Sequence, residues 1–136
     1  MTIRILLVDD HKIIRNSLRS MIENQSGLEI IGEADNGRTA LMLVHDLLPD
    51  VVLMDIKMPG MDGILATMEI RRLHPSVKVI GLSMHSDKRF ILRMMDAGAS
   101  GYFLKDCALD EIIEGIRTVA DGGTYLRSKV MDLSVR

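Results

Sequence analysis

The sequence predicts an α/β domain in which a five-stranded parallel sheet is covered by helices on both faces. Five short apolar runs, at residues 3–8, 28–31, 51–54, 77–82 and 101–104, are rich in β-branched residues. They are apolar at most positions rather than alternating, which is typical of strands buried on both faces. The runs begin 23 to 26 residues apart, the length of one strand, one helix and two short loops.

The segments between and after the runs carry apolar residues at helical spacing, which predicts a helix after each strand. Each stripe should face the sheet, so the order is five successive strand–helix units. The stripes, in chain order, are Ile13, Ile14, Leu18, Met21 and Ile22; Leu41, Val44, Leu47 and Leu48; Ile64, Leu65 and Met68; Ile91, Met94 and Met95; and Ile112, Ile113, Ile116 and Val119.

The composition restricts the class of protein. A chain of 136 residues with 47% hydrophobic content fits one ordinary domain. Its 17 basic and 19 acidic residues give a net charge of -2, which argues against a broad nucleic-acid-binding surface. A lone cysteine, Cys107, and eleven methionines indicate a reducing compartment, so we expect a cytoplasmic protein. No apolar run approaches the roughly 18 residues of a membrane span, so we expect neither a signal peptide nor a membrane anchor.

Polar residues follow four of the five predicted strands. Asp9 and Asp10 follow the first, Asp55 the third, Ser83 the fourth and Lys105 the fifth. Because parallel strands joined by right-handed crossovers end at one edge, these side chains should meet there. Three carboxylates at one edge repel each other, and oxygen ligands select a hard cation, so we expect Mg²⁺, with Mn²⁺ as a substitute. Such a site fits phosphoryl transfer to an aspartate.

Four motifs in combination resemble the receiver domain of two-component response regulators over residues 2–122. They are LLVDDH at 6–11, MDIKMPGMDG at 54–63, GLS at 81–83 and DAGASGYFLKD at 96–106. The last motif and the following ALDEIIEGIRTVADGG are similar to the NarL/FixJ (LuxR-type) subfamily. The resemblance implies a flavodoxin-like (CheY-like) doubly wound sheet of order 2-1-3-4-5. Residues 1–122 would form the receiver, and 123–136 a linker or truncated tail toward a missing C-terminal DNA-binding domain.

The resemblance also implies roles for individual residues. Asp55 would accept a phosphoryl group from a sensor histidine kinase, and Lys105 and Ser83 would contact its oxygens. Ser83 and Tyr102 would form a conformational switch in which the tyrosine ring turns inward on activation. Asp10, Asp55 and the backbone carbonyl of Lys57 would hold Mg²⁺, with Asp9 acting through a water. The expected output is transcription, with a possible homodimer on phosphorylation and with DNA bound only through a domain absent from this chain.

Some positions depart from the resemblance or leave alternatives open. Asp106 stands where most receivers have proline, so we expect a trans peptide after Lys105. Lys57 and His85 lie two residues after Asp55 and Ser83, and we expect both to screen the phosphoryl group from water. We expect His11 to have a surface role. The alternatives are an Mg²⁺-dependent aspartyl-phosphate phosphatase and a protein-binding pseudo-receiver, but Lys57 occupies the place where such phosphatases carry a second aspartate. We therefore expect a phosphorylation switch rather than a turnover enzyme.

Overall fold

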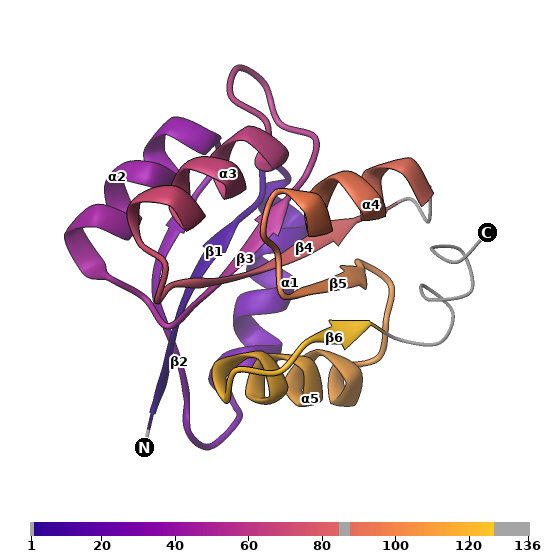
Figure 1. Cartoon of the computed structure of the whole chain (residues 1–136). Helices are drawn as coiled ribbons and strands as arrows, with labels where there is room; N and C mark the ends of the chain where they lie inside the picture. The colour runs from indigo at the N-terminus through magenta and orange to yellow at the C-terminus, as the bar shows by residue number, and fades with distance from the viewer. Residues whose placement is uncertain (1, 85–87, 127–136) are drawn as a thin grey trace.

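The computed structural model describes residues 2–84 and 88–126 and shows a parallel sheet between two layers of helices (Figure 1). The strands run in the order β2-β1-β3-β4-β5-β6, so the order 2-1-3-4-5 is confirmed and one strand is added. The elements are β1 (Ile3–Val8), α1 (Lys12–Glu23), β2 (Leu28–Ala34), α2 (Gly37–Leu47), β3 (Val51–Asp55), α3 (Gly63–Leu73), β4 (Lys78–Ser83), α4 (Lys88–Asp96), β5 (Gly101–Leu104), α5 (Leu109–Ala120) and β6 (Tyr125–Leu126).

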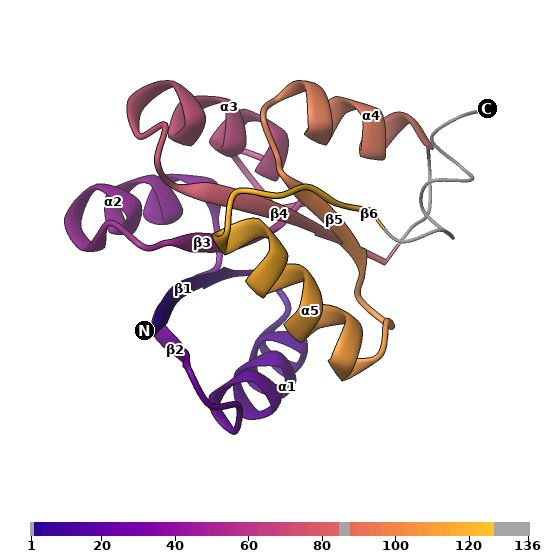
Figure 2. The ribbon, with the colours of Figure 1, turned by 60° about the horizontal axis from the view of Figure 1, so that its bottom comes forward.

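The sheet separates two hydrophobic cores, as expected for strands buried on both faces. Helices α2, α3 and α4 cover one face and α1 and α5 cover the other (Figure 2). Successive residues of β1 alternate between the cores: Leu6 and Val8 face the first group of helices, and Ile5 and Leu7 face the second. This alternation explains why residues 5–8 of the strand are all apolar.

Close backbone approach fixes the start of α3 against the end of β3. The amide of Gly63 donates to the carbonyl of Ile56 at 2.8 Å. A Cβ atom on Gly63 would lie 1.9 Å from the carbonyl oxygen of Asp55, so only glycine fits here. The side chain of Asp62 caps α3 by accepting from the amide of Leu65. These contacts hold the loop that follows Asp55.

Two residues of the stretch 123–136, which we expected to be a linker or tail, form the sixth strand. Tyr125 and Leu126 pair in parallel with Gly101 and Tyr102 of β5. The Tyr125 ring packs edge-on against Phe103 with a centroid distance of 5.5 Å. Gly115 of α5 admits both rings, because a Cβ atom there would lie 2.2 Å from Phe103 and 2.8 Å from Tyr125. The sheet therefore extends past residue 122.

Several residues assigned to buried stripes are exposed. Ile13 is 81% exposed on α1, whose buried residues are Leu18 and Ile22. Leu65 and Met68 are each 52% exposed, because α3 instead turns Ile64, Ala66, Thr67 and Ile70 inward. Leu48, which ends α2 with a left-handed backbone, is 54% exposed as well. The remaining stripes supply buried or half-buried residues as predicted.

Candidate functional site

The carboxyl ends of four adjacent strands bring the predicted polar residues to one edge of the sheet. Asp9 and Asp10 follow β1, Asp55 and Ser83 end β3 and β4, and Lys105 follows β5. Asp9, Asp55 and Ser83 are buried. The amide of Lys105 donates to the carbonyl of Ser83 at 2.9 Å, which continues the β4–β5 pairing into the site.

The ammonium group of Lys105 joins two buried carboxylates. Its Nζ lies 2.7 Å from Asp9 Oδ2 and 3.2 Å from Asp55 Oδ1. The Lys105 side chain is only 2% exposed, so this contact is formed in a medium of low polarity, where charge pairs interact strongly. One positive charge nevertheless faces three carboxylates, since Asp10 lies in the same cluster. The site therefore keeps an excess of negative charge.

Burial and the neighbouring negative charge both affect the pKa of Asp55. Burial of the carboxyl group, followed by repulsion from Asp9, raises the pKa of Asp55 to about 7, although Lys105 opposes the rise. Asp55 Oδ2 is buried and has no hydrogen-bond partner among the described residues. A cation at this oxygen would stabilise the ionised carboxylate and lower its pKa.

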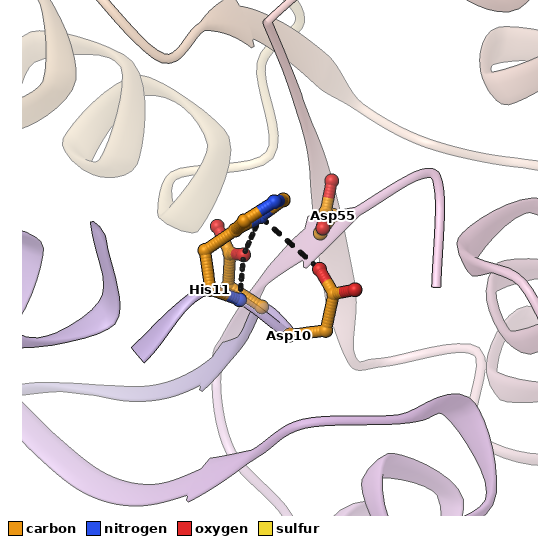
Figure 3. Close-up of side chains that lie close together, drawn as sticks. Asp10, His11 and Asp55 are labelled. Atoms are coloured by element: carbon orange, nitrogen blue, oxygen red, sulfur yellow. Dashed lines mark hydrogen bonds and ion pairs between the residues drawn. The ribbon is translucent and has the colours of Figure 1, made fainter. Parts of the chain in front are cut away.

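His11 lies beside the acidic pair with its side chain 57% exposed, so it is at the surface, as we expected, and also in contact with the site. Its Nδ1 lies 3.1 Å from Asp9 Oδ1 and 3.1 Å from Asp10 Oδ1. Its backbone amide donates to Asp9 Oδ1 at 2.8 Å. Figure 3 shows the imidazole beside the Asp10 carboxylate, with Asp55 on the neighbouring strand. The reason is local: the bend that starts α1 directs the side chain at its N-terminus back over the acidic pair.

Arg15 supports the acidic loop and was not identified from the sequence. Its Nη1 donates to the backbone carbonyl of Asp9 at 2.7 Å, while its Nε contacts Glu33 Oε1 at 3.0 Å. Glu33 lies on β2, so the arginine ties the loop after β1 to the neighbouring strand. The spacing of four residues from His11, one helical turn, was the available signal.

The remaining predicted residues lie around this cluster. Lys57 follows β3, but its Nζ lies 4.8 Å from the centre of the Phe90 ring on α4, a cation–π geometry. Asp10 and Lys57 line a common hollow of about 420 Å³ beside the site. His85 lies outside the described residues. Cis peptide bonds are absent from the described residues, so the trans peptide predicted after Lys105 is confirmed.

Tyr102 of β5 is completely buried. A Cβ atom on Gly81 would lie 3.1 Å from Tyr102 Cδ2 and 3.0 Å from Met94 Cε. The ring therefore occupies the inward position beside β4, and the absence of a side chain at residue 81 leaves room for it. The resemblance implies an inward ring on activation, and the switch itself stays a prediction.

The carboxylates of the site fit a hard divalent cation. Asp9, Asp10, His11 and Asp55 each offer one ligand atom, and these atoms lie within 4.8 Å of one another. Carboxylate oxygens are the protein ligands that Mg²⁺ and Mn²⁺ prefer. A bound cation would neutralise the excess negative charge. It would also give a partner to Asp55 Oδ2, which has no hydrogen-bond partner among the described residues.

Comparison with known proteins decides the family, because residues 5–117 match the response regulator receiver domain. The chain belongs to this family. It is 40% identical over 128 residues to the response regulator GacA of Pseudomonas viridiflava, covering 94% of this chain and 60% of that protein. It is 42% identical over 130 residues to the transcriptional regulatory protein MctR of Rhizobium johnstonii, covering 96% and 61%. The receiver chain thus spans about 60% of these relatives' length.

Solved structures agree with this assignment. A LuxR-family two-component response regulator from Aurantimonas sp. SI85-9A1 superposes with a TM-score of 0.94 at 33% identity, covering 99% of this chain and 96% of that one. The receiver domain of the putative response regulator NarL from Mycobacterium tuberculosis gives 0.85 at 32% identity, covering 89% and 98%. The flavodoxin-like fold and the NarL/FixJ resemblance are confirmed. Within residues 2–84 and 88–126, every helix is too short or too polar to span a membrane.

Proposed function

We propose that this receiver domain accepts a phosphoryl group on Asp55 from the phosphohistidine of a sensor histidine kinase and uses it to switch conformation. The contact of one buried lysine with both Asp9 and Asp55 carries this proposal. It places a positive charge beside a buried carboxylate that has one oxygen without a hydrogen-bond partner among the described residues. This arrangement suits a nucleophile whose product carries additional negative charge.

In the proposed reaction, an ionised oxygen of Asp55 forms a bond to phosphorus while the bond from phosphorus to the donor imidazole nitrogen breaks. The imidazole leaves with the electron pair of that bond and takes up a proton from solvent. Lys105 stays between Asp9 and Asp55 and offsets charge on the acceptor side. Phosphoryl transfer needs positioning and charge compensation more than covalent assistance, and the buried lysine supplies part of both.

Asp10, Asp55 and the backbone carbonyl of Lys57 would hold Mg²⁺, with Asp9 contributing through a water; Mn²⁺ would substitute. The bound cation supplies charge neutralisation to the carboxylates and to the phosphoryl oxygens. The two adjacent aspartates differ in exposure. The Asp10 side chain is 29% exposed, whereas the Asp9 side chain is fully buried against Lys105. This difference supports direct contact by Asp10 and a more remote role for Asp9.

The switch would connect the phosphoryl group to the β4–β5 region of the fold. Ser83 would move to donate to a phosphoryl oxygen, and Tyr102 would occupy its buried position beside Gly81 in the activated state. A phosphoryl group adds roughly -1.5 to -2 charge and rewards any arrangement that brings donors closer. The activated receiver would form a homodimer or change its contact with a DNA-binding domain, and would thereby control transcription. We expect the protein to be cytoplasmic.

Two alternatives are disfavoured by particular residues. A phosphatase would need an acid near Asp55, but the side chain two residues later, Lys57, directs its ammonium group to Phe90. A pseudo-receiver would not need a buried lysine bridging two carboxylates, as Lys105 does here. We therefore favour a switch that assists its own phosphorylation over an enzyme that turns over an external substrate.

Intact-mass measurement after incubation with acetyl phosphate and Mg²⁺ separates the three possibilities. A switch gains one phosphoryl group, and Asp55→Asn abolishes the gain. Catalytic release of inorganic phosphate without accumulation of the labelled chain would indicate the phosphatase. A properly folded chain that gains no mass would indicate the pseudo-receiver, and circular dichroism of both proteins supplies the folding control.

A further inference from the structure

We propose that His11 is a nitrogen ligand of the acidic site and makes it selective for divalent cations that accept imidazole, such as Zn²⁺, over Mg²⁺. The inference extends the proposed metal site and depends on its carboxylates. It concerns a residue to which the phosphorylation mechanism assigns no task.

The first support is the position of the imidazole nitrogen. His11 Nδ1 is 3.1 Å from Asp9 Oδ1 and 3.1 Å from Asp10 Oδ1. Neighbouring ligands around a metal with bonds of about 2.1 Å lie about 3.0 Å apart in octahedral geometry and about 3.4 Å apart in the tetrahedral geometry typical of Zn²⁺, and 3.1 Å falls within this range. The nitrogen therefore already has the spacing of a ligand adjacent to both carboxylates. Figure 3 shows the imidazole directed toward the same space as the Asp10 carboxylate.

The second support comes from the buried side of the cluster. Asp55 is 3% exposed, and its Oδ2 is without a hydrogen-bond partner among the described residues. The ligand atoms offered by Asp9, Asp10, His11 and Asp55 lie within 4.8 Å of one another. Ligands from the segment between β1 and α1 and a further oxygen from β3 therefore converge on a volume of ion size.

The third support is the fit between ligand type and cation. Mg²⁺ binds oxygen and keeps several waters, whereas Zn²⁺ binds imidazole nitrogen together with carboxylate oxygen. To bind a metal through Nδ1, the ring must carry its proton on Nε2. The His11 side chain is 57% exposed, so the ring can exchange its proton with water. Lys105 remains in contact with Asp9 Oδ2 and Asp55 Oδ1 and still offsets part of the carboxylate charge.

Replacement of His11 separates nitrogen ligation from binding by carboxylates alone. Zn²⁺ and Mg²⁺ would each be titrated by calorimetry into the wild-type chain, His11→Gln and the control His74→Gln. The control matters because His74 and His45, at the ends of α3 and α2, have ring centroids 5.6 Å apart and form a competing pair of imidazoles. We expect His11→Gln to weaken Zn²⁺ binding about tenfold or more and to change Mg²⁺ affinity by less than roughly twofold.

Imidazole nitrogen NMR gives an independent readout. In ¹⁵N-labelled protein, Zn²⁺ should shift the Nδ1 resonance of His11, whereas Mg²⁺ should leave it unchanged. An unchanged ratio of Zn²⁺ to Mg²⁺ affinity in His11→Gln, or a Zn²⁺-induced shift confined to the other histidines, would overturn the inference. Failure of Mg²⁺ to bind the wild-type chain would instead contradict the proposed function, so the two failures are distinguishable.

Discussion

Replacing Asp55 with asparagine should stabilise the metal-free domain at neutral and alkaline pH. Asn keeps the shape of the side chain but removes a charge that burial and Asp9 disfavour. Lys105 keeps its 2.7 Å contact with Asp9. The variant therefore loses the favourable contact of Asp55 with Lys105. It also removes the cost of a buried charge beside Asp9, and we expect this second effect to be the larger.

The magnitude follows from the pKa of Asp55, which is raised from 3.8 to about 7 in the folded protein. Raising the pKa of a carboxyl group from 3.8 to about 7 corresponds to about 4 kcal/mol. Asn also gives up the 3.2 Å charge contact with Lys105 and still buries a polar group, so we expect a gain of about 1–2 kcal/mol for Asp55→Asn. Between pH 3.8 and about pH 7, Asp55 keeps its proton in the folded chain but has lost it in the unfolded chain. Wild-type stability therefore falls as pH rises from about 4 to 7.

Urea unfolding in the presence of EDTA, repeated between pH 4 and 8, tests this expectation. The gap between Asp55→Asn and wild type should be small near pH 4, grow to pH 7 and then stay constant. Asp46→Asn, at an exposed position of α2, is the matched control and should change stability by less than about 0.5 kcal/mol at any pH. A variant less stable than wild type at pH 8, or a gap independent of pH, would refute an excess of negative charge at the site.

Four further substitutions address the rest of the site. Lys105→Met should destabilise the metal-free domain by about 3 kcal/mol, because it leaves buried carboxylates without their cation; a change in the urea midpoint corresponding to less than about 1 kcal/mol would contradict this. Gly81→Ala should crowd the Tyr102 ring and lower the population of its buried rotamer, because the added carbon would lie 3.1 Å from the ring and 3.0 Å from Met94 Cε. Unchanged side-chain NMR couplings for the tyrosine would argue against a switch that depends on space at residue 81. Lys57→Asn and His85→Asn should each shorten the phosphoryl half-life by allowing water to be oriented near Asp55, and equal decay in both variants and wild type would remove the screening role.

The order and position of the five main strands could be predicted because the central strands β1, β3 and β4 are largely buried on both faces. Runs that are apolar at most positions, such as Ile3–Val8, are typical of buried strands, and connections of similar length favour parallel crossovers. The convergence of Asp9, Asp55 and Lys105 followed from the same topology. Residues at strand ends are placed by the sheet itself.

Other features depend on contacts that no local pattern carries. Tyr125 and Leu126 form a two-residue strand, too short for a periodicity, and it is positioned by packing against Phe103 and Gly115. On α1, Ile13 lies one position away from the buried stripe, and sequence spacing alone did not separate it from Ile14. The contacts of His11 with Asp9 and Asp10 depend on the turn between β1 and α1, whose geometry the composition of the turn does not determine.

The chemical identity of the phosphorylated residue tests the central claim most directly. Borohydride reduces an aspartyl phosphate to homoserine, so treatment of the phosphorylated chain followed by tandem mass spectrometry locates the acceptor without a mutation. We predict homoserine at position 55 in the sample treated with acetyl phosphate and Mg²⁺, and none in the sample treated with EDTA. Homoserine at Asp9 or Asp10 in place of Asp55, or phosphorylation on a residue outside the acidic cluster, would contradict the assignment of Asp55 as the acceptor.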